Sequence, residues 1–107
     1  MSADFTIRQN DTGPIFASTL KNPDGNPENL TAATVTFEMR HQATGTLVTG
    51  ACAIVNASLG QVAYHWVAGN TALPGWYYAL FSVTYSGGLV ETYPNDKFMT
   101  VLVTPVV

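Results

Sequence analysis

The sequence has few charged residues and a single cysteine. Charged side chains make up 10% of its 107 residues, against about 25% in an ordinary soluble domain. Its four cations, Arg8, Lys21, Arg40 and Lys97, are scattered, whereas nucleic-acid binding requires clustered cations. The one cysteine, Cys52, excludes an intrachain disulfide. We therefore expect no nucleic-acid partner, and a chain that folds in a cytoplasm without disulfides.

Long apolar runs are also missing. No run approaches the roughly 18 residues of a membrane span, and the chain does not open with the basic and apolar regions of a signal peptide. We expect no membrane partner. Hydrophobic residues nevertheless make up 47% of the chain, and its polarity comes mainly from Thr, Asn, Ser and Gln. Low charge suits a surface partly covered by neighbouring subunits, because charge is depleted at the core of interfaces.

Turn residues divide the chain into short runs of strand length. In 34–40 the odd positions Val35, Phe37 and Met39 are apolar and the even positions polar, which is the period of a half-buried strand. In 76–85 both faces are apolar at the start, as in a central strand. Many short strands with frequent turns indicate a sandwich or a barrel, and the length suits one domain, 1–107.

The expected strands are 4–9, 14–20, 33–41, 45–49, 51–56, 61–67, 76–85 and 89–104, the last broken near 94–96. We expect 4–9 and 97–104 to be the sheet edges. The loop 68–75 has room for a single helical turn.

Aromatic residues gather in one third of the chain. Strand alternation places most of them in the core, and it leaves Trp76 and Tyr78 as the candidate outward contacts for a partner. Tyr77 follows Gly75 by two residues at a strand start, which resembles the tyrosine corner of immunoglobulin-like sandwiches, where the phenol bonds a nearby backbone group.

No group of residues predicts catalysis or metal binding. His41 and His65 lie on different expected strands, without cysteine or carboxylate at ligand spacing. The 24–28 loop alternates oxygen-bearing side chains but lacks the calcium-loop pattern. Cys52 lies in an apolar run, where a free cysteine behaves as a small hydrophobe. We expect no enzyme activity and no cofactor.

The segment 93–97 places a phenol, an amide, a carboxylate and an ammonium group together. Pro94 cannot donate to a sheet ladder, so it ends or bulges the strand before it. We expect Asn95 and Asp96 to cap a bend that moves the chain from one sheet edge toward the other. As an exposed loop it also makes Asn95 and Asp96 candidate partner contacts.

Five segments resemble one known family in the same order. They are DFTIRQNDT at 4–12, DGNP at 24–27 with LTAATVTF at 30–37, GQVAY at 60–64, PGWY at 74–77 and ETYPND at 91–96. Together they resemble the N-terminal domain of phage baseplate upper proteins. The resemblance implies an all-β fold, an immunoglobulin-like antiparallel β-sandwich of about eight strands, in a tailed-phage virion. It supplies no catalytic residues.

In that family the domain anchors a longer protein to the baseplate, whereas this chain ends at Val107, directly after the last expected strand. We therefore expect a structural or accessory virion protein that is made in the host cytoplasm, is multimeric in the particle and binds other virion proteins. Attachment to the baseplate or tail ranks ahead of capsid decoration. The alternative is a carbohydrate- or host-surface-binding module that uses Trp76 and Tyr78.

Overall fold

The structure is a computed structural model that describes residues 3–94 and 98–106. These residues form nine strands and one short 3-10 helix. The strands are β1 (Phe5–Arg8), β2 (Phe16–Thr19), β3 (Thr34–His41), β4 (Leu47–Ala51), β5 (Ala53–Asn56), β6 (Gln61–Tyr64), β7 (Gly75–Thr84), β8 (Val90–Tyr93) and β9 (Met99–Thr104). The helix η1 (Ala57–Leu59) lies between β5 and β6. The loop 68–75 contains a turn at 68–71 and no helix.

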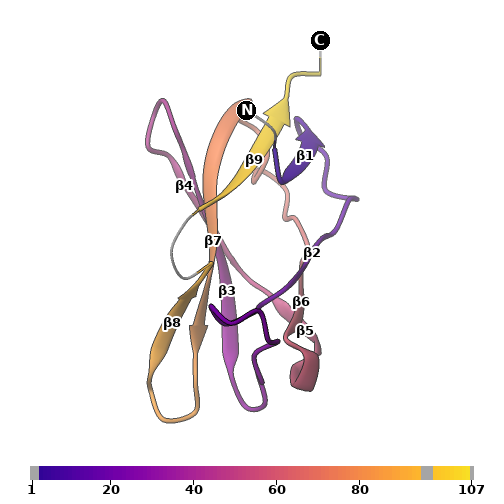
Figure 1. Ribbon diagram of the computed structural model, residues 1–107. Helices are drawn as coiled ribbons and strands as arrows, with labels where there is room; N and C mark the ends of the chain where they lie inside the picture. Colours follow the sequence, from indigo (N-terminus) through magenta and orange to yellow (C-terminus); the bar gives the residue numbers. More distant parts are fainter. Residues whose placement is uncertain (1–2, 95–97, 107) are drawn as a thin grey trace.

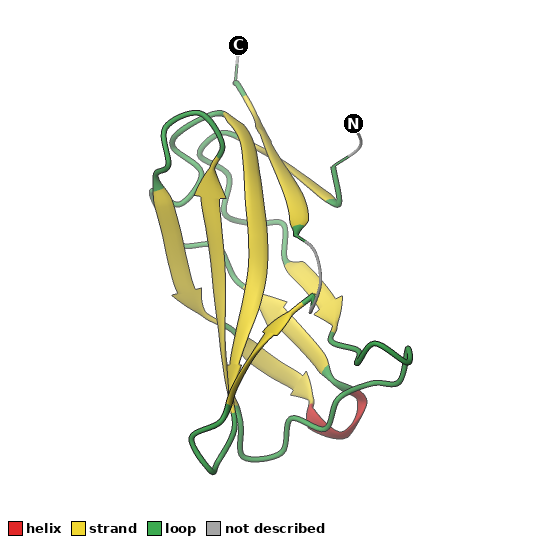
Figure 2. Ribbon diagram, turned by 60° about the vertical axis from the view of Figure 1, so that its left-hand side comes forward, coloured by secondary structure: helices red, strands yellow, loops and turns green. Residues whose placement is uncertain are grey.

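The strands form two facing sheets (Figures 1 and 2). The large sheet has the order β1-β9-β7-β3-β4, with β8 also paired to β7, and the small sheet has the order β2-β6-β5. This arrangement confirms the predicted all-β sandwich. One pairing departs from the antiparallel prediction, because β1 runs parallel to β9. These two strands come from opposite ends of the sequence, so no tight turn forces them to be antiparallel.

The prediction that 97–104 supplies a sheet edge is wrong. β9 lies between β7 and β1, with Phe5 opposite Val101 and Arg8 opposite Thr104. β1 is the edge strand on that side, as expected, and β4 is the edge strand on the other. An alternating apolar strand marks a buried face but does not reveal which strands lie beside it, so the sequence could not distinguish these positions.

The core lies between the inward faces of the two sheets. Val35, Phe37 and Met39 of β3 are buried, as the alternation predicts, and so are the odd positions of β7 from Tyr77 to Val83. Phe37 stacks on Tyr64 of the small sheet, with the ring centroids 4.5 Å apart. Aromatic pairs of this kind add about 0.5–1.5 kcal/mol beyond the area they bury.

The chain changes sheets at Cys52. β4 belongs to the large sheet and β5 to the small one, and only Cys52 separates them. Its N–H donates to the carbonyl of Val35 at 2.9 Å, which is the last bond to the large sheet before the chain crosses. The predicted break near Gly50 therefore lies two residues too early.

β8 and β9 both pair with the same edge of β7. Tyr93 lies opposite Phe81 and Met99 lies opposite Ala79, so β9 resumes on the edge of β7 that β8 occupies. Pro94 follows the last residue of β8, as predicted. The expected move from one sheet edge toward the other is wrong, because the chain resumes along the same neighbour. Asn95 and Asp96, with their expected turn caps, lie outside the described residues.

Candidate partner-binding surface

Two side chains form hydrogen bonds with the loop that leads into β7. The Tyr77 hydroxyl donates to the carbonyl of Leu73, which confirms the tyrosine-corner prediction. Beside it, His41 is buried, and its Nε2 lies 2.9 Å from the carbonyl of Pro74. His41 Nδ1 accepts from the N–H groups of Ala43 and Thr44, at 3.2 Å each, which leaves the hydrogen on Nε2 to be donated to Pro74. This histidine joins two loops and is not free to bind a ligand.

The outer face of the large sheet carries the even-numbered residues of β3 and β7. Register places Arg40 opposite both Tyr78 and Leu47, and Glu38 opposite Leu80. Residues directly opposite each other project to the same side of a sheet. The solvent side of an antiparallel sheet is ordinarily polar, yet three of these five side chains are apolar or aromatic.

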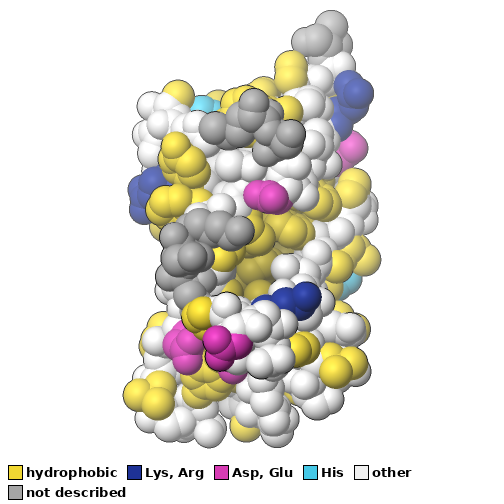
Figure 3. All heavy atoms as spheres, viewed as in Figure 1, with side chains coloured by type: hydrophobic (Ala, Val, Ile, Leu, Met, Phe, Trp, Pro, Cys, Tyr) yellow, Lys and Arg dark blue, Asp and Glu magenta, His cyan; other side chains and the backbone are white. Residues whose placement is uncertain are grey.

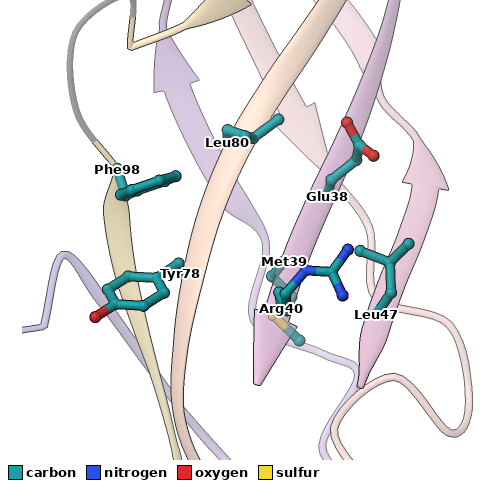
Figure 4. Close-up of a pocket in the computed structure, with 7 residues that line it drawn as sticks. All are labelled: Glu38, Met39, Arg40, Leu47, Tyr78, Leu80 and Phe98. Carbon is teal, nitrogen blue, oxygen red and sulfur yellow. The ribbon is translucent and has the colours of Figure 1, made fainter. Parts of the chain in front are cut away.

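These residues line a shallow groove of about 240 Å³, which we call the outer groove. Its lining residues are Glu38, Met39, Arg40, Leu47, Tyr78, Leu80 and Phe98 (Figure 4). Tyr78 and Phe98 lie at one side of it, with their ring centroids 5.1 Å apart and their planes tilted by 37°. Tyr78 is 42% exposed and Phe98 59% exposed. Two adjacent exposed aromatic rings are a common anchor for a partner.

The two charged residues of the outer groove lie on β3. The Arg40 Nη1 donates to the carbonyl of Gly45 at 2.9 Å, so the guanidinium is tied to the loop between β3 and β4. Glu38 projects from the same strand toward the far end of the groove from Tyr78 (Figure 4). The groove therefore offers an apolar floor with one anchored cation and one carboxylate beside it, which suits a mixed apolar and polar protein surface.

A second hollow opens between the two sheets. It has a volume of about 290 Å³ and is lined by residues of β2, the β2–β3 connection, β7, β8 and β9, among them Phe81, Tyr93 and Lys21. Figure 3 shows hydrophobic side chains in the hollow of this face, with cationic and acidic side chains beside it. The floor consists of core residues seen from the side, so the hollow is where the sandwich stays open between β2 and the large sheet.

Of the two predicted contact residues that the structure describes, only one is found in the outer groove. Tyr78 lines the outer groove and is exposed, whereas Trp76 is half-buried on the same face and does not line it. Asn95 and Asp96 lie outside the described residues. Phe98 is not among the predicted contact residues, because the sequence places it in the expected strand 89–104. The sequence carries no signal for this role, because Phe98 reaches Tyr78 only through the pairing of β9 with β7.

Burial raises the pKa of the free thiol and of several phenols among the described residues. Burial raises the pKa of the Cys52 thiol to about 12, so it carries almost no thiolate at neutral pH and is a poor nucleophile. Burial is the main cause that raises the pKa of Tyr93, and the hydrogen bond with Tyr85 raises it further. Across 3–94 and 98–106, no group of three or more His, Cys, Asp or Glu side chains could hold a metal ion. The same ranges contain no helix long and apolar enough to span a membrane.

Comparison with known proteins identifies a fold and no family. No protein-family model matches the sequence, and no curated protein matches it either. Among solved structures, it is similar to the N-terminal domain of phage TP901-1 ORF48, with a TM-score of 0.71 and 17% sequence identity. The similarity covers 94% of this chain and 83% of that one. At this identity the comparison establishes a shared sandwich fold.

Proposed function

We propose that this protein is a structural or accessory component of a tailed-phage virion that binds other virion proteins and catalyses no reaction. The observation that carries the proposal is the similarity in fold, over 94% of the chain, to a domain of a phage protein. The ordered sequence segments described above resemble a phage family independently of that comparison. The site of action is the virion, after synthesis in the host cytoplasm.

The outer groove is the surface we assign to this binding. It combines an exposed aromatic pair, Tyr78 and Phe98, with the apolar side chains of Leu47 and Leu80. Tyr78, Leu80 and Leu47 lie on paired strands of the large sheet, so their backbone loses little conformational entropy on contact. Repeated copies in a particle would add avidity to a weak single contact. Attachment to the tail or baseplate ranks ahead of capsid decoration, because the family that the sequence resembles is a baseplate family.

Purified particles test this role directly. Phage particles are purified on a density gradient, heads and tails are separated, and this protein is quantified in each fraction. We expect it in particles and in the tail fraction. Detection only in soluble lysate would overturn the virion role, and detection only in heads would replace tail attachment by capsid decoration.

Variants of the outer groove test the assigned surface. Tyr78→Ala and Phe98→Ala each remove one ring of the exposed pair, and we expect each to lower incorporation into particles at least fivefold, as the loss of about 1 kcal/mol or more at an anchor predicts. Val55→Ala, at an exposed apolar position on the small sheet, is the control and should leave incorporation unchanged. Unchanged incorporation of both groove variants would place the contact elsewhere.

The exposed aromatic pair also favours one alternative, a carbohydrate- or host-surface-binding module. Tyrosine and phenylalanine rings side by side can pack against the apolar face of a sugar. Binding of the purified protein to host cells or glycans, lost in folded Tyr78→Ala, would support this alternative. Absence of such binding, together with incorporation into particles, would exclude it.

A further inference from the structure

One side of the sandwich is formed by strands that contain no charged residue. No Asp, Glu, Lys or Arg occurs from 41 to 90, a segment that includes β4, β5, β6 and β7. β4 is the last strand of the large sheet and β5 the last strand of the small one. Because only Cys52 separates them, both edges lie on the same side of the sandwich. We call the edge formed by β4, residues 47–51, the neutral edge.

The neutral edge lacks the features that ordinarily protect a sheet edge. Natural edge strands carry lysine, proline, bulges or inward charges, which prevent pairing with another chain. β4 has the sequence LVTGA, with neither charge nor proline. Its register with β3 is continuous from Arg40 opposite Leu47 to Thr36 opposite Ala51. β4 therefore presents a regular, unprotected edge, and Figure 2 shows no strand beyond it.

The hydrogen-bond pattern shows which backbone groups are free to pair. In β4 and at its ends, even-numbered residues bond to β3, since the N–H of Cys52 donates to Val35 and the carbonyl of Thr46 accepts from His41. In an antiparallel pair, bonded and outward-facing residues alternate. The N–H and carbonyl groups of Leu47, Thr49 and Ala51 therefore point away from the sheet.

The outward backbone groups of β4 are complementary to the same groups of a second copy of the chain. If two copies of β4 lie antiparallel with Thr49 opposite Thr49, each Leu47 lies opposite the Ala51 of the other copy. All three outward residues then fall at hydrogen-bonded positions. The side chains that meet are Thr with Thr and Leu with Ala, so no like charges are brought together, although each chain carries a net charge of −3.

We propose that two copies of this chain pair through the edge of β4, in an antiparallel and two-fold symmetric arrangement centred on Thr49. The large sheets of the two copies then form one continuous sheet. The outer grooves lie on the same face of this sheet, because Leu47 belongs to both the groove and the edge. The dimer gives a specific form to the multimeric state in the proposed function, and it brings two copies of the proposed binding surface together.

Sedimentation velocity of the purified chain over a concentration series tests the dimer without any phage component. We expect a reversible monomer–dimer equilibrium. Thr49→Lys places a charge at the centre of the edge, and Thr49→Pro removes the central outward N–H while leaving the bonds to β3 intact. Each should raise the dimer dissociation constant about tenfold or more, whereas Thr49→Val keeps the backbone groups and should retain the dimer.

Amide hydrogen exchange locates the contact. The N–H groups of Leu47, Thr49 and Ala51 should become protected as the concentration of the native protein rises, and they should stay unprotected in Thr49→Lys. A monomer at all concentrations, an undefined series of aggregates, or a dimer that survives both disrupting variants would overturn the proposal. A monomer that is still incorporated into particles would overturn the dimer alone and leave the virion role standing.

Discussion

Tyr64 links the two sheets at the scale of a single residue. Its ring stacks on Phe37, and its hydroxyl donates to Asn70 Oδ1 at 2.6 Å. The same oxygen of Asn70 accepts from the N–H of Val67 at 2.8 Å. The ring also lies directly against Gly50 of β4, where an added Cβ would come within 2.5 Å of the Tyr64 hydroxyl oxygen. Gly50 is therefore required by packing.

The variant Gly50→Ala tests this contact. Because Tyr64 is fully buried, its ring has little room to move, and we expect a loss of about 1–3 kcal/mol in the free energy of unfolding, measured by urea denaturation. Gly87→Ala is the control, since an added Cβ there meets no heavy atom within 4 Å. It should change stability by less than about 0.5 kcal/mol. Equal effects of the two variants would contradict the packing argument.

At the scale of elements, β7 is the central strand and its entry is fixed by the tyrosine corner. Tyr77 and Tyr78 are adjacent but face opposite sides of the sheet: Tyr77 is buried and bonds Leu73, whereas Tyr78 is exposed in the outer groove. The two positions therefore form a matched pair, in which the same loss of a hydroxyl has different consequences.

We expect Tyr77→Phe to lower the free energy of unfolding by about 1–2 kcal/mol, because it removes a hydrogen bond made inside the protein. Tyr78→Phe should leave stability within about 0.5 kcal/mol of the native protein. Thermal unfolding followed by circular dichroism measures both. A Tyr78→Phe variant at least as destabilised as Tyr77→Phe would show that the corner bond does not hold the start of β7.

The elements also show what the sequence could predict. Alternation in 34–40 and 76–85 correctly gave the buried faces of β3 and β7, because a two-residue period depends only on local sequence. The tyrosine corner was predictable for the same reason, since its two partners lie within five residues of each other.

Features that depend on distant residues were not predictable in this way. The parallel pairing of β1 with β9, the change of sheet at Cys52 and the return of β9 to the edge of β7 all depend on neighbours far along the chain. The residues of the outer groove also include both predictable and unpredictable positions. Tyr78 follows from alternation, whereas Leu47 and Phe98 join it only through the pairing of β4 and β9 with their neighbours.

At the scale of the whole molecule, buried phenols and one thiol determine how stability depends on pH. Burial raises the pKa values of Tyr64, Tyr77, Tyr85, Tyr93 and Cys52. The unfolded values are about 10 for tyrosine and 8.5 for cysteine. Above those values the unfolded chain releases protons that the folded chain retains, so the stability contributed by these groups is complete at lower pH and is lost as the pH rises.

We therefore expect the urea midpoint to be nearly constant from about pH 7 to 8 and to fall above about pH 9. Tyr93→Phe removes one of the shifted groups and should make the fall less steep, whereas Gly87→Ala removes no titratable group and should leave the slope unchanged. The urea midpoint of each variant is measured at several pH values, and its change with pH is compared with that of the native protein. A midpoint that rises between pH 9 and 11 would contradict the sign of this linkage.

The pairing of β1 with β9 has a consequence for how the chain is made. Phe5 and Val101 are partners, so the first strand emerges from the ribosome long before its neighbour exists. Contacts between residues so distant in sequence form slowly, because a long loop must close before they contribute. Until residues 99–104 are synthesised, the paired edge of β1 and the adjacent edge of β7 stay uncovered. The final strand is thus the step that closes the large sheet, and a ribosome that stalls before it leaves a nascent chain with open strands.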